Sequence, residues 1–99
     1  METRYIWDAR KAKNNQRKHG VSFETAREVF EDPNQVVSES YFIEDEQRMQ
    51  VIGMTRGFVL LLVVFVDRSE PDLDLIRIIS ARKANAYERK IYAAQSQNH

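Results

Sequence analysis

Hydrophobic and polar residues follow a helical pattern in the first third of the chain. Asp8 is a good N-cap for a helix over residues 9–18, and Gly20 is placed to end it. Ser22 is a second N-cap, for a helix from residue 23 to about 31. The apolar side of this second helix is expected in the core and consists of Phe23, Ala26, Val29 and Phe30. The first helix has alanines as its only apolar residues, so hydrophobic burial gives it little reason to dock.

From residue 35 onward the pattern changes to that of β-strands separated by short polar turns. Four segments are rich in β-branched and aromatic residues: 35–43, 48–55, 58–66 and 75–80. The third of these segments is uniformly apolar, which predicts a central strand covered on both faces. Residues 4–7 form a short extended lead-in, whose Trp7 we expect in the core.

A last helix is predicted from residue 81 to about 94, followed by a polar tail at about 95–99. Its buried stripe would consist of Ala84, Tyr87, Ile91 and Ala94. Tyr92, one step off this stripe, stays open as a residue that could stack on a base. The order of these elements predicts an α+β fold. We expect one domain, residues 1–99, with a compact antiparallel sheet of about four strands, two helices before it and one after it.

The composition narrows the classes of function. The 99 residues contain no cysteine, which excludes disulfides, thiolate zinc sites and cysteine nucleophiles. With only two histidines, a metal site would need carboxylates, and the acidic triplet 44–46 is typical of a solvated turn, so we predict no metal and no cofactor. The longest apolar run has nine residues, whereas a membrane helix needs about 20. The N-terminus lacks the apolar region of a secretion signal, so we expect a cytoplasmic protein without membrane contact.

The formal net charge of zero hides an uneven distribution. Residues 1–20 carry six basic and two acidic side chains, residues 76–99 carry five and one, and residues 21–47 carry one and eight. Basic ends of this kind indicate an anionic partner. The alternative is that the basic ends pair with the acidic middle of the chain.

Arginines in the predicted strands are the main candidates for chemistry. Arg77 lies in an apolar strand, so its guanidinium needs a carboxylate, a backbone oxygen or an incoming phosphate as partner. Taken alone, a structural ion pair is the simpler interpretation. If Arg48 and Arg82 lay near Arg77 at one end of the sheet, three guanidiniums could hold a phosphodiester and stabilise a pentacoordinate transition state.

The first helix and its end offer further polar groups. His19 is the one residue of the folded region that can move a proton near neutral pH, although a cation at a helix C-terminus is another ordinary role for it. Lys11, Asn15 and Lys18 form one stripe of the helix, which suits either phosphate contact or solvent.

Two blocks of sequence resemble a known family: KHGVSFE at 18–24 and RIISARKA at 77–84. Shorter matching pieces lie around and between them: Trp7-Asp8, Lys11-Ala12, Asn15, Ala26, Val29-Phe30, Asp32-Pro33, Glu46, Arg48, Ile52-Gly53, Glu88-Arg89 and Tyr92. In these residues, from 7 to 92, the chain is similar to the BrnT toxins of bacterial type II toxin–antitoxin systems.

The resemblance implies a RelE/ParE-like fold and a ribonuclease that cleaves RNA and arrests translation. It also implies a cognate BrnA-like antitoxin, a heterotetramer of two toxins and two antitoxins, and operator DNA bound only through the antitoxin. The implied reaction is metal-independent, with the 2′-OH of the RNA attacking the adjacent phosphate and leaving a cyclic phosphate. The acidic segment 21–47 would then face a basic part of the antitoxin.

Carried onto this sequence, the resemblance gives two sets of site residues. The catalytic set is Arg48, Arg77 and Arg82, with His19 and Glu46 for proton transfer and with Lys18 and Lys83 in support. The RNA-binding set is Lys11, Lys18, Lys83, Arg89 and Tyr92. Two features depart from the family: Arg56-Gly57 places a basic residue slightly early in its hairpin, and the acidic loop 67–74 should lie away from RNA. Two alternatives remain, a non-catalytic nucleic-acid-binding or regulatory module and a degenerate toxin that only binds its antitoxin.

Overall fold

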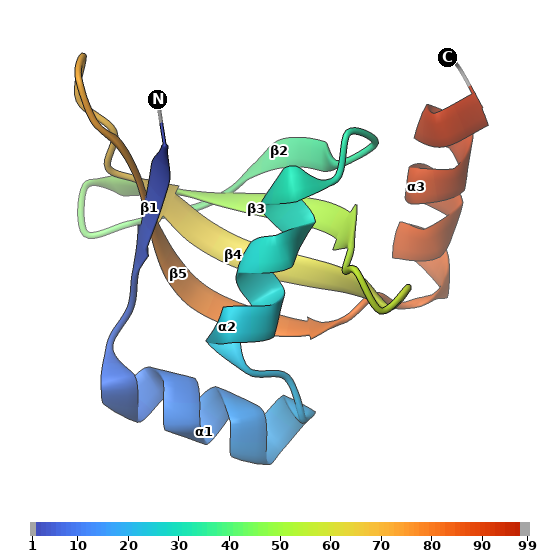
Figure 1. Ribbon diagram of the computed structural model, residues 1–99, viewed down its shortest axis with the longest axis horizontal. Coiled ribbons are helices and arrows are strands. Elements are labelled where there is room, and N and C mark those ends of the chain that lie inside the picture. Colours follow the sequence, from blue (N-terminus) through green and yellow to red (C-terminus); the bar gives the residue numbers. More distant parts are fainter. Residues whose placement is uncertain (1, 98–99) are drawn as a thin grey trace.

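Five strands and three α-helices make up residues 2–97, the part of the chain that the computed structural model describes (Figure 1). In chain order the elements are β1 (Thr3–Ile6), α1 (Ala9–His19), α2 (Phe23–Ala26) with the continuing 3₁₀ turn η1 (Arg27–Glu31), β2 (Val36–Ile43), β3 (Glu46–Met54), β4 (Leu60–Asp67), β5 (Asp74–Lys83) and α3 (Ala86–Gln97). The predicted α+β fold, with two helices near the N-terminus and one at the C-terminus, is confirmed.

The strands form one mixed sheet in the order β1-β5-β4-β3-β2. β2 to β5 pair antiparallel with their neighbours, and β4 is the central strand, as its apolar sequence predicts. β1 pairs in parallel with the first half of β5, from Thr3 opposite Asp74 to Ile6 opposite Arg77. The prediction of a purely antiparallel sheet of about four strands is therefore wrong, because the short lead-in is too brief to show a strand period in the sequence.

One face of the sheet is covered by α2, η1 and part of α1 (Figure 1). Phe23 and Val29 are fully buried there, in one cluster with Val51 of β3 and Val63 of β4. Half-buried Trp7 packs edge-on against Phe23, with ring centroids 5.9 Å apart. The predicted core side of the second helix and the predicted core position of Trp7 are both confirmed.

α1 is fastened to β5 by a polar side chain. Asn15 is 7% exposed, and its amide accepts a hydrogen bond from the Ala81 N–H (3.1 Å) and donates one to the Ala81 carbonyl (2.9 Å). It also donates to the carbonyl of Val21 (3.0 Å). Because β1 ends opposite Arg77, Asn15 takes the place of a neighbouring strand farther along the edge of β5. Hydrogen bonds thus hold a helix that has little apolar surface.

The other face of the sheet is covered by α3 at one end. Ile91 and Tyr92 of α3 pack against Ile52 and Leu62, which pair across β3 and β4. Farther along these strands, the same face carries side chains that are not part of the apolar cluster under α3. We call that part of the sheet the open face, and its residues are Arg48, Gln50, Val64, Val66, Arg77 and Ser80.

The boundary between β5 and α3 lies later than predicted. Residues 81–83 still pair with β4, and α3 begins at Ala86, where the Asn85 side chain accepts a hydrogen bond from the Glu88 N–H (2.8 Å). With this later start, Tyr87 is 72% exposed and Ala94 is also exposed, so their predicted place in the core is wrong. Residues 95–97 of the predicted tail continue α3, and 98–99 lie outside the described residues. Within residues 2–97, each helix is too short or too polar to span a membrane.

Candidate nucleic-acid interface

Four charged side chains meet on one side of the sheet, near the ends of three strands. Glu46 and Arg48 open β3, Arg68 directly follows β4, and Arg77 lies in β5 opposite Val66. Because side chains alternate along a strand, Arg48 and Arg77 belong to the same face, on either side of β4. We call these four residues the Glu46 cluster: Glu46, Arg48, Arg68 and Arg77.

Two guanidiniums share one carboxylate in this cluster. Arg68 Nη2 lies 2.6 Å from Glu46 Oε2, and Arg77 Nη1 lies 3.8 Å from Glu46 Oε1. The side chain of Glu46 is 26% exposed, that of Arg77 29% and that of Arg68 44%. Arg77 therefore has the carboxylate partner that the ion-pair interpretation predicts, but at a long distance.

Arg48 contributes a donor that is not satisfied. Its Nε atom is buried and has no hydrogen-bond partner among the described residues. A charged donor that is buried and unpaired costs free energy, which binding of an acceptor would recover. Together with Arg68 and Arg77, it makes a surface with more guanidinium than carboxylate charge. Phosphate suits such a surface, because it accepts two N–H bonds from one guanidinium.

Arg82 does not join the Glu46 cluster. It pairs with Leu62, four residues from Val66 on β4, which is about 13 Å along the strand. Its guanidinium donates two hydrogen bonds of 2.8 Å to the carboxylate of Glu88 in α3. These bonds raise the pKa of Arg82 and lower the pKa of Glu88. Arg82 therefore does not meet the condition under which three guanidiniums could hold one phosphodiester.

The basic stripe of α1 borders the same strand as Arg77. A cavity of about 230 Å³ between α1 and β5 is lined by Lys11, Asn14, Asn15, Lys18, His19, Ile79 and Ser80. A bulge at Ile79 shifts the register of β5, so that Ser80 shares the open face with Arg77. His19 is half-buried at this margin, and the two lysines are exposed. Asn15 shares this stripe with Lys11 and Lys18 as expected, but its amide is bound to the backbone of β5, so neither phosphate contact nor solvent is its role.

The remaining predicted RNA contacts lie elsewhere. Lys83 pairs with Leu61 on the helix-covered side of the sheet, and Arg89 is exposed on α3. The Tyr92 hydroxyl donates a hydrogen bond to Asp32 Oδ2 (2.6 Å). Burial and this hydrogen bond raise the pKa of Tyr92 to about 12. Tyr92 is thus a half-buried link between α3 and the turn before β2, which leaves it poorly placed to stack on a base.

Arg68 is the residue of this site that the sequence interpretation missed. It belongs to the acidic loop 67–74, which was expected to lie away from RNA, yet its guanidinium reaches Glu46. A usable signal was present, since a residue that directly follows a central strand must lie at the end of the sheet. There it stands beside the first residues of the antiparallel neighbour, which here are those of β3.

Side chains that could bind a metal ion do not gather in the part of the chain that the structure describes. Within residues 2–97 there is no group of three or more His, Asp or Glu side chains placed to hold one. Glu46 is bound by two guanidiniums instead.

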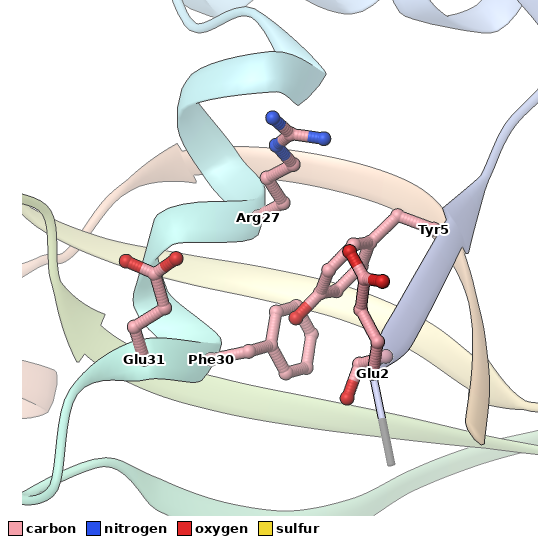
Figure 2. A pocket seen from close by; sticks show the side chains of 6 residues that line it. Glu2, Tyr5, Arg27, Phe30 and Glu31 are labelled. Atoms are coloured by element: carbon pink, nitrogen blue, oxygen red, sulfur yellow. The ribbon is translucent and has the colours of Figure 1, made fainter.

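A larger cavity lies on the helix-covered side of the sheet and contains none of the predicted site residues (Figure 2). Its volume is about 350 Å³, and it is lined by Glu2, Thr3, Tyr5, Arg27, Phe30 and Glu31. The rings of Tyr5 and Phe30 lie 5.5 Å apart, with Glu31 on the Phe30 side of the view, Glu2 on the Tyr5 side and the Arg27 guanidinium above them (Figure 2). Burial and the charge of Glu31 raise the pKa of Tyr5. We call this cavity the acidic cavity.

Comparison with known proteins gives a family and a fold. The profile of one protein family matches residues 7–88, and the family is described as the ribonuclease toxin BrnT of type II toxin–antitoxin systems. Among solved structures, the chain is similar to the crystal structure of the Brucella abortus ribonuclease toxin BrnT, with a TM-score of 0.57 and 23% sequence identity. That match covers 85% of this chain and 99% of the other, and at this identity it concerns the fold. Comparison with curated proteins found no match.

Proposed function

Since this chain belongs to the BrnT family, the ribonuclease toxins of type II toxin–antitoxin systems, we propose that its open face binds RNA and cleaves the sugar–phosphate backbone. The Glu46 cluster is the observation that supports this proposal best. Arg48 has a buried donor without a partner among the described residues, and Arg77 is paired only loosely, so both guanidiniums can donate hydrogen bonds to a phosphate that lies between them. Val66, the side chain of β4 between them, is buried and apolar. The two guanidiniums are therefore the groups at this position that can bind a phosphate.

In the proposed reaction, the 2′-oxygen of a ribose attacks the adjacent phosphorus. The bond from phosphorus to the 5′-oxygen of the next nucleotide breaks. A base takes the 2′ proton and an acid protonates the leaving 5′-oxygen, so the products are a 2′,3′-cyclic phosphate and a 5′-hydroxyl. Arg48 and Arg77 stabilise the additional negative charge of the pentacoordinate transition state, and no metal ion takes part.

Glu46 and His19 are the candidates for proton transfer. Glu46 stands beside Arg77, within the group that would hold the phosphate. His19 lines the cavity that also contains Ser80, on the same strand and face as Arg77. Each can exchange a proton with a ribose or leaving oxygen once RNA lies across β5.

The RNA nucleotides on either side of the cleaved bond would contact basic residues outside the Glu46 cluster. Arg82 stands about 13 Å from Arg77 along the sheet, so it would contact a neighbouring phosphate instead of the cleaved one. Lys11 and Lys18 would hold the strand at the margin of α1. Arg89, exposed on α3, stays in the proposal as an outer contact. Lys83 on the helix-covered side and the hydrogen-bonded Tyr92 would contact only RNA that extends beyond the open face.

The biological setting follows from the family. A type II toxin has an antitoxin partner. We propose that this partner is BrnA-like, that two toxins and two antitoxins form a heterotetramer, and that operator DNA is bound through the antitoxin. Cleavage of RNA would arrest translation in the cytoplasm. The fold of the toxin would be of the RelE/ParE-like type. The acidic cavity would receive a basic part of the antitoxin, because two carboxylates flank its aromatic floor.

A cleavage assay with purified protein tests the proposed function. In the presence of a chelator, the wild type should cut RNA and leave cyclic phosphate ends. Arg77→Ala should lose roughly 100-fold or more of this activity, the usual effect of removing one group that stabilises transition-state charge. Arg27→Ala, which removes an exposed arginine from the other side of the sheet, is the matched control and should stay active.

The other outcomes of this assay separate the alternatives. Intact RNA with a folded wild type would contradict the ribonuclease. Salt-dependent RNA binding without cleavage would indicate a non-catalytic module. Antitoxin binding without RNA cleavage or growth arrest would indicate a degenerate toxin.

A further inference from the structure

We infer that Arg68 is a positioning residue of the RNA site, which holds the carboxylate of Glu46 away from Arg77 and so keeps Arg77 available for phosphate. This role presupposes that the open face binds RNA, as proposed above. It extends that proposal to a residue outside both predicted sets of site residues. Arg68 would act through Glu46, without touching the RNA.

Two arginines compete for one carboxylate, and Arg68 binds it more closely. The Arg68–Glu46 contact is 2.6 Å, a strong charge-assisted hydrogen bond. The Arg77–Glu46 distance is 3.8 Å, which is attraction without a hydrogen bond. Arg77 therefore keeps its N–H groups for another acceptor while its charge remains partly balanced.

The backbone fixes the place of Arg68. Its N–H donates to the Leu75 carbonyl (2.9 Å), and the Leu75 N–H donates to Ser69 Oγ (3.0 Å). The Ser69 N–H in turn donates to Asp67 Oδ1 (2.9 Å). These hydrogen bonds tie the start of the loop to β5. The guanidinium of Arg68 thus extends from a fixed point beside Glu46.

Removal of Arg68 would change the pairing of Glu46. The carboxylate would lose its closer partner and move to Arg77, which stands within reach. At hydrogen-bond distance it would neutralise the guanidinium that is proposed to bind phosphate, and RNA would have to displace it. The effect of losing Arg68 should therefore depend on the charge of Glu46.

A double-mutant cycle measures this dependence. The probe is an RNA oligonucleotide with 2′-O-methyl groups, which cannot be cleaved by 2′ attack, and its Kd is measured by fluorescence anisotropy. We expect Arg68→Gln to raise the Kd roughly tenfold and Glu46→Gln to lower it about threefold, within the range of coupling between contacting charges. The variant with both substitutions should bind at least as tightly as the wild type.

Two further variants complete the experiment. Arg68→Lys keeps the positive charge beside Glu46 and should stay within about threefold of the wild-type Kd. Arg27→Gln removes one exposed arginine from the opposite side of the sheet and should change the Kd less than about twofold. Thermal melting of each variant separates a changed Kd from a changed fold.

The outcomes distinguish this inference from the proposed function. If Arg68→Gln raises the Kd by the same factor with and without Glu46→Gln, Arg68 contacts RNA directly and the positioning role is overturned. A Kd for Arg68→Lys as high as that for Arg68→Gln would overturn it as well. A folded wild type that does not bind the oligonucleotide contradicts the proposed function and, with it, this role. Wild-type binding that Arg68→Gln leaves unchanged overturns the role of Arg68 alone.

Discussion

Asp32 is a single carboxylate that joins three parts of the chain. It is 9% exposed and accepts hydrogen bonds from the Asn34 N–H (2.9 Å) and the Met54 N–H (2.8 Å). The Tyr92 hydroxyl donates a third (2.6 Å). Burial alone would raise the pKa of Asp32, but these three hydrogen bonds together hold it below its ordinary value. Asp32 thus connects its own turn with β3 and α3. The sequence predicts only that it helps to end a helix.

Because of the Tyr92–Asp32 hydrogen bond, the free energy of unfolding should change with pH in the alkaline range. Tyr92→Phe should lower the free energy of unfolding by about 2 kcal/mol at neutral pH, because a hydrogen bond to a buried carboxylate is lost. The pKa of Tyr92 rises from 10.0 to about 12 on folding, so the folded protein holds this proton more tightly. The contribution is therefore complete below pH 10 and declines as the pH rises from 10 towards 12.

Urea unfolding of both proteins from about pH 8 to 11 measures this linkage. The difference in unfolding free energy between wild type and Tyr92→Phe should shrink above pH 10. Tyr87→Phe, at a tyrosine of the same helix that is 72% exposed, is the control and should change stability by less than about 0.5 kcal/mol. A difference that stays constant up to the highest pH would contradict the role of the Tyr92 proton.

Between elements, β3 and η1 approach so closely that glycine alone fits between them. A Cβ added at Gly53 would lie 2.7 Å from Val29 Cβ and 2.9 Å from the Val29 carbonyl oxygen. A change of side-chain rotamer cannot relieve the contact with a backbone atom. Gly53→Ala should therefore lower the free energy of unfolding by about 1–3 kcal/mol, measured by urea unfolding. Gly57→Ala is the control, since its Cβ would have its nearest neighbour at 3.9 Å, and equal effects of the two substitutions would contradict the close approach.

Elements with local start and stop signals could be predicted from the sequence. The Asp8 side chain accepts a hydrogen bond from the Lys11 N–H at the start of α1, and Ser22 accepts one from the Thr25 N–H at the start of α2. Gly20 has a φ of 71°, the left-handed conformation that ends α1. These caps act within a few residues, so the sequence alone is enough to find them.

Elements that depend on distant partners could not be predicted in this way. β1 is a strand because β5 lies beside it. β5 continues through residues 81–83 because β4 and the side chain of Asn15 provide its hydrogen bonds, although the same residues would suit the start of a helix. The intrinsic propensity of these residues carries no information about either distant partner.

The candidate site could likewise be predicted only in part. Arg48 and Arg77 stand out because they are charged residues in apolar strands, and the structure brings them to one face. Arg68 was hidden by the acidic composition of its loop. Arg82 lies apart from them because it pairs with Leu62 farther along β4 and is bound by Glu88 of α3, a partner that depends on where this helix begins. Register and helix start therefore decide which arginines can share a phosphate.

Across the whole molecule, the net charge of zero separates into regions of opposite charge. On the open face, two guanidiniums share the Glu46 carboxylate, and Arg48 adds a third positive charge to the Glu46 cluster. On the helix-covered side, α2 and η1 carry Glu24, Glu28 and Glu31, all at least partly exposed. Two regions of opposite charge suit two partners of opposite charge, which in the function proposed above are RNA and a basic part of the antitoxin.

Charge removal at the acidic cavity tests this division of the surface. Glu2→Gln combined with Glu31→Gln takes away the two carboxylates beside the Tyr5 and Phe30 rings, and we expect antitoxin to bind roughly three- to tenfold more weakly at low salt. Biolayer interferometry at low and high salt should show the difference shrinking as salt screens the charges. RNA cleavage should stay within about twofold of the wild type, because the open face is untouched.

The stability of this variant should change little. Glu31 also pairs with Arg56 at 2.8 Å, but both side chains are more than half exposed (58% and 68%), and exposed ion pairs contribute little. The control removes two other exposed carboxylates, by Glu70→Gln with Asp72→Asn in the loop after β4. Equal weakening by the control would mean that the antitoxin responds to overall charge, and unchanged binding by the cavity variant would mean that the antitoxin binds elsewhere. Weakening confined to the cavity variant, with RNA cleavage intact, is the result expected if RNA and antitoxin use opposite sides of one sheet.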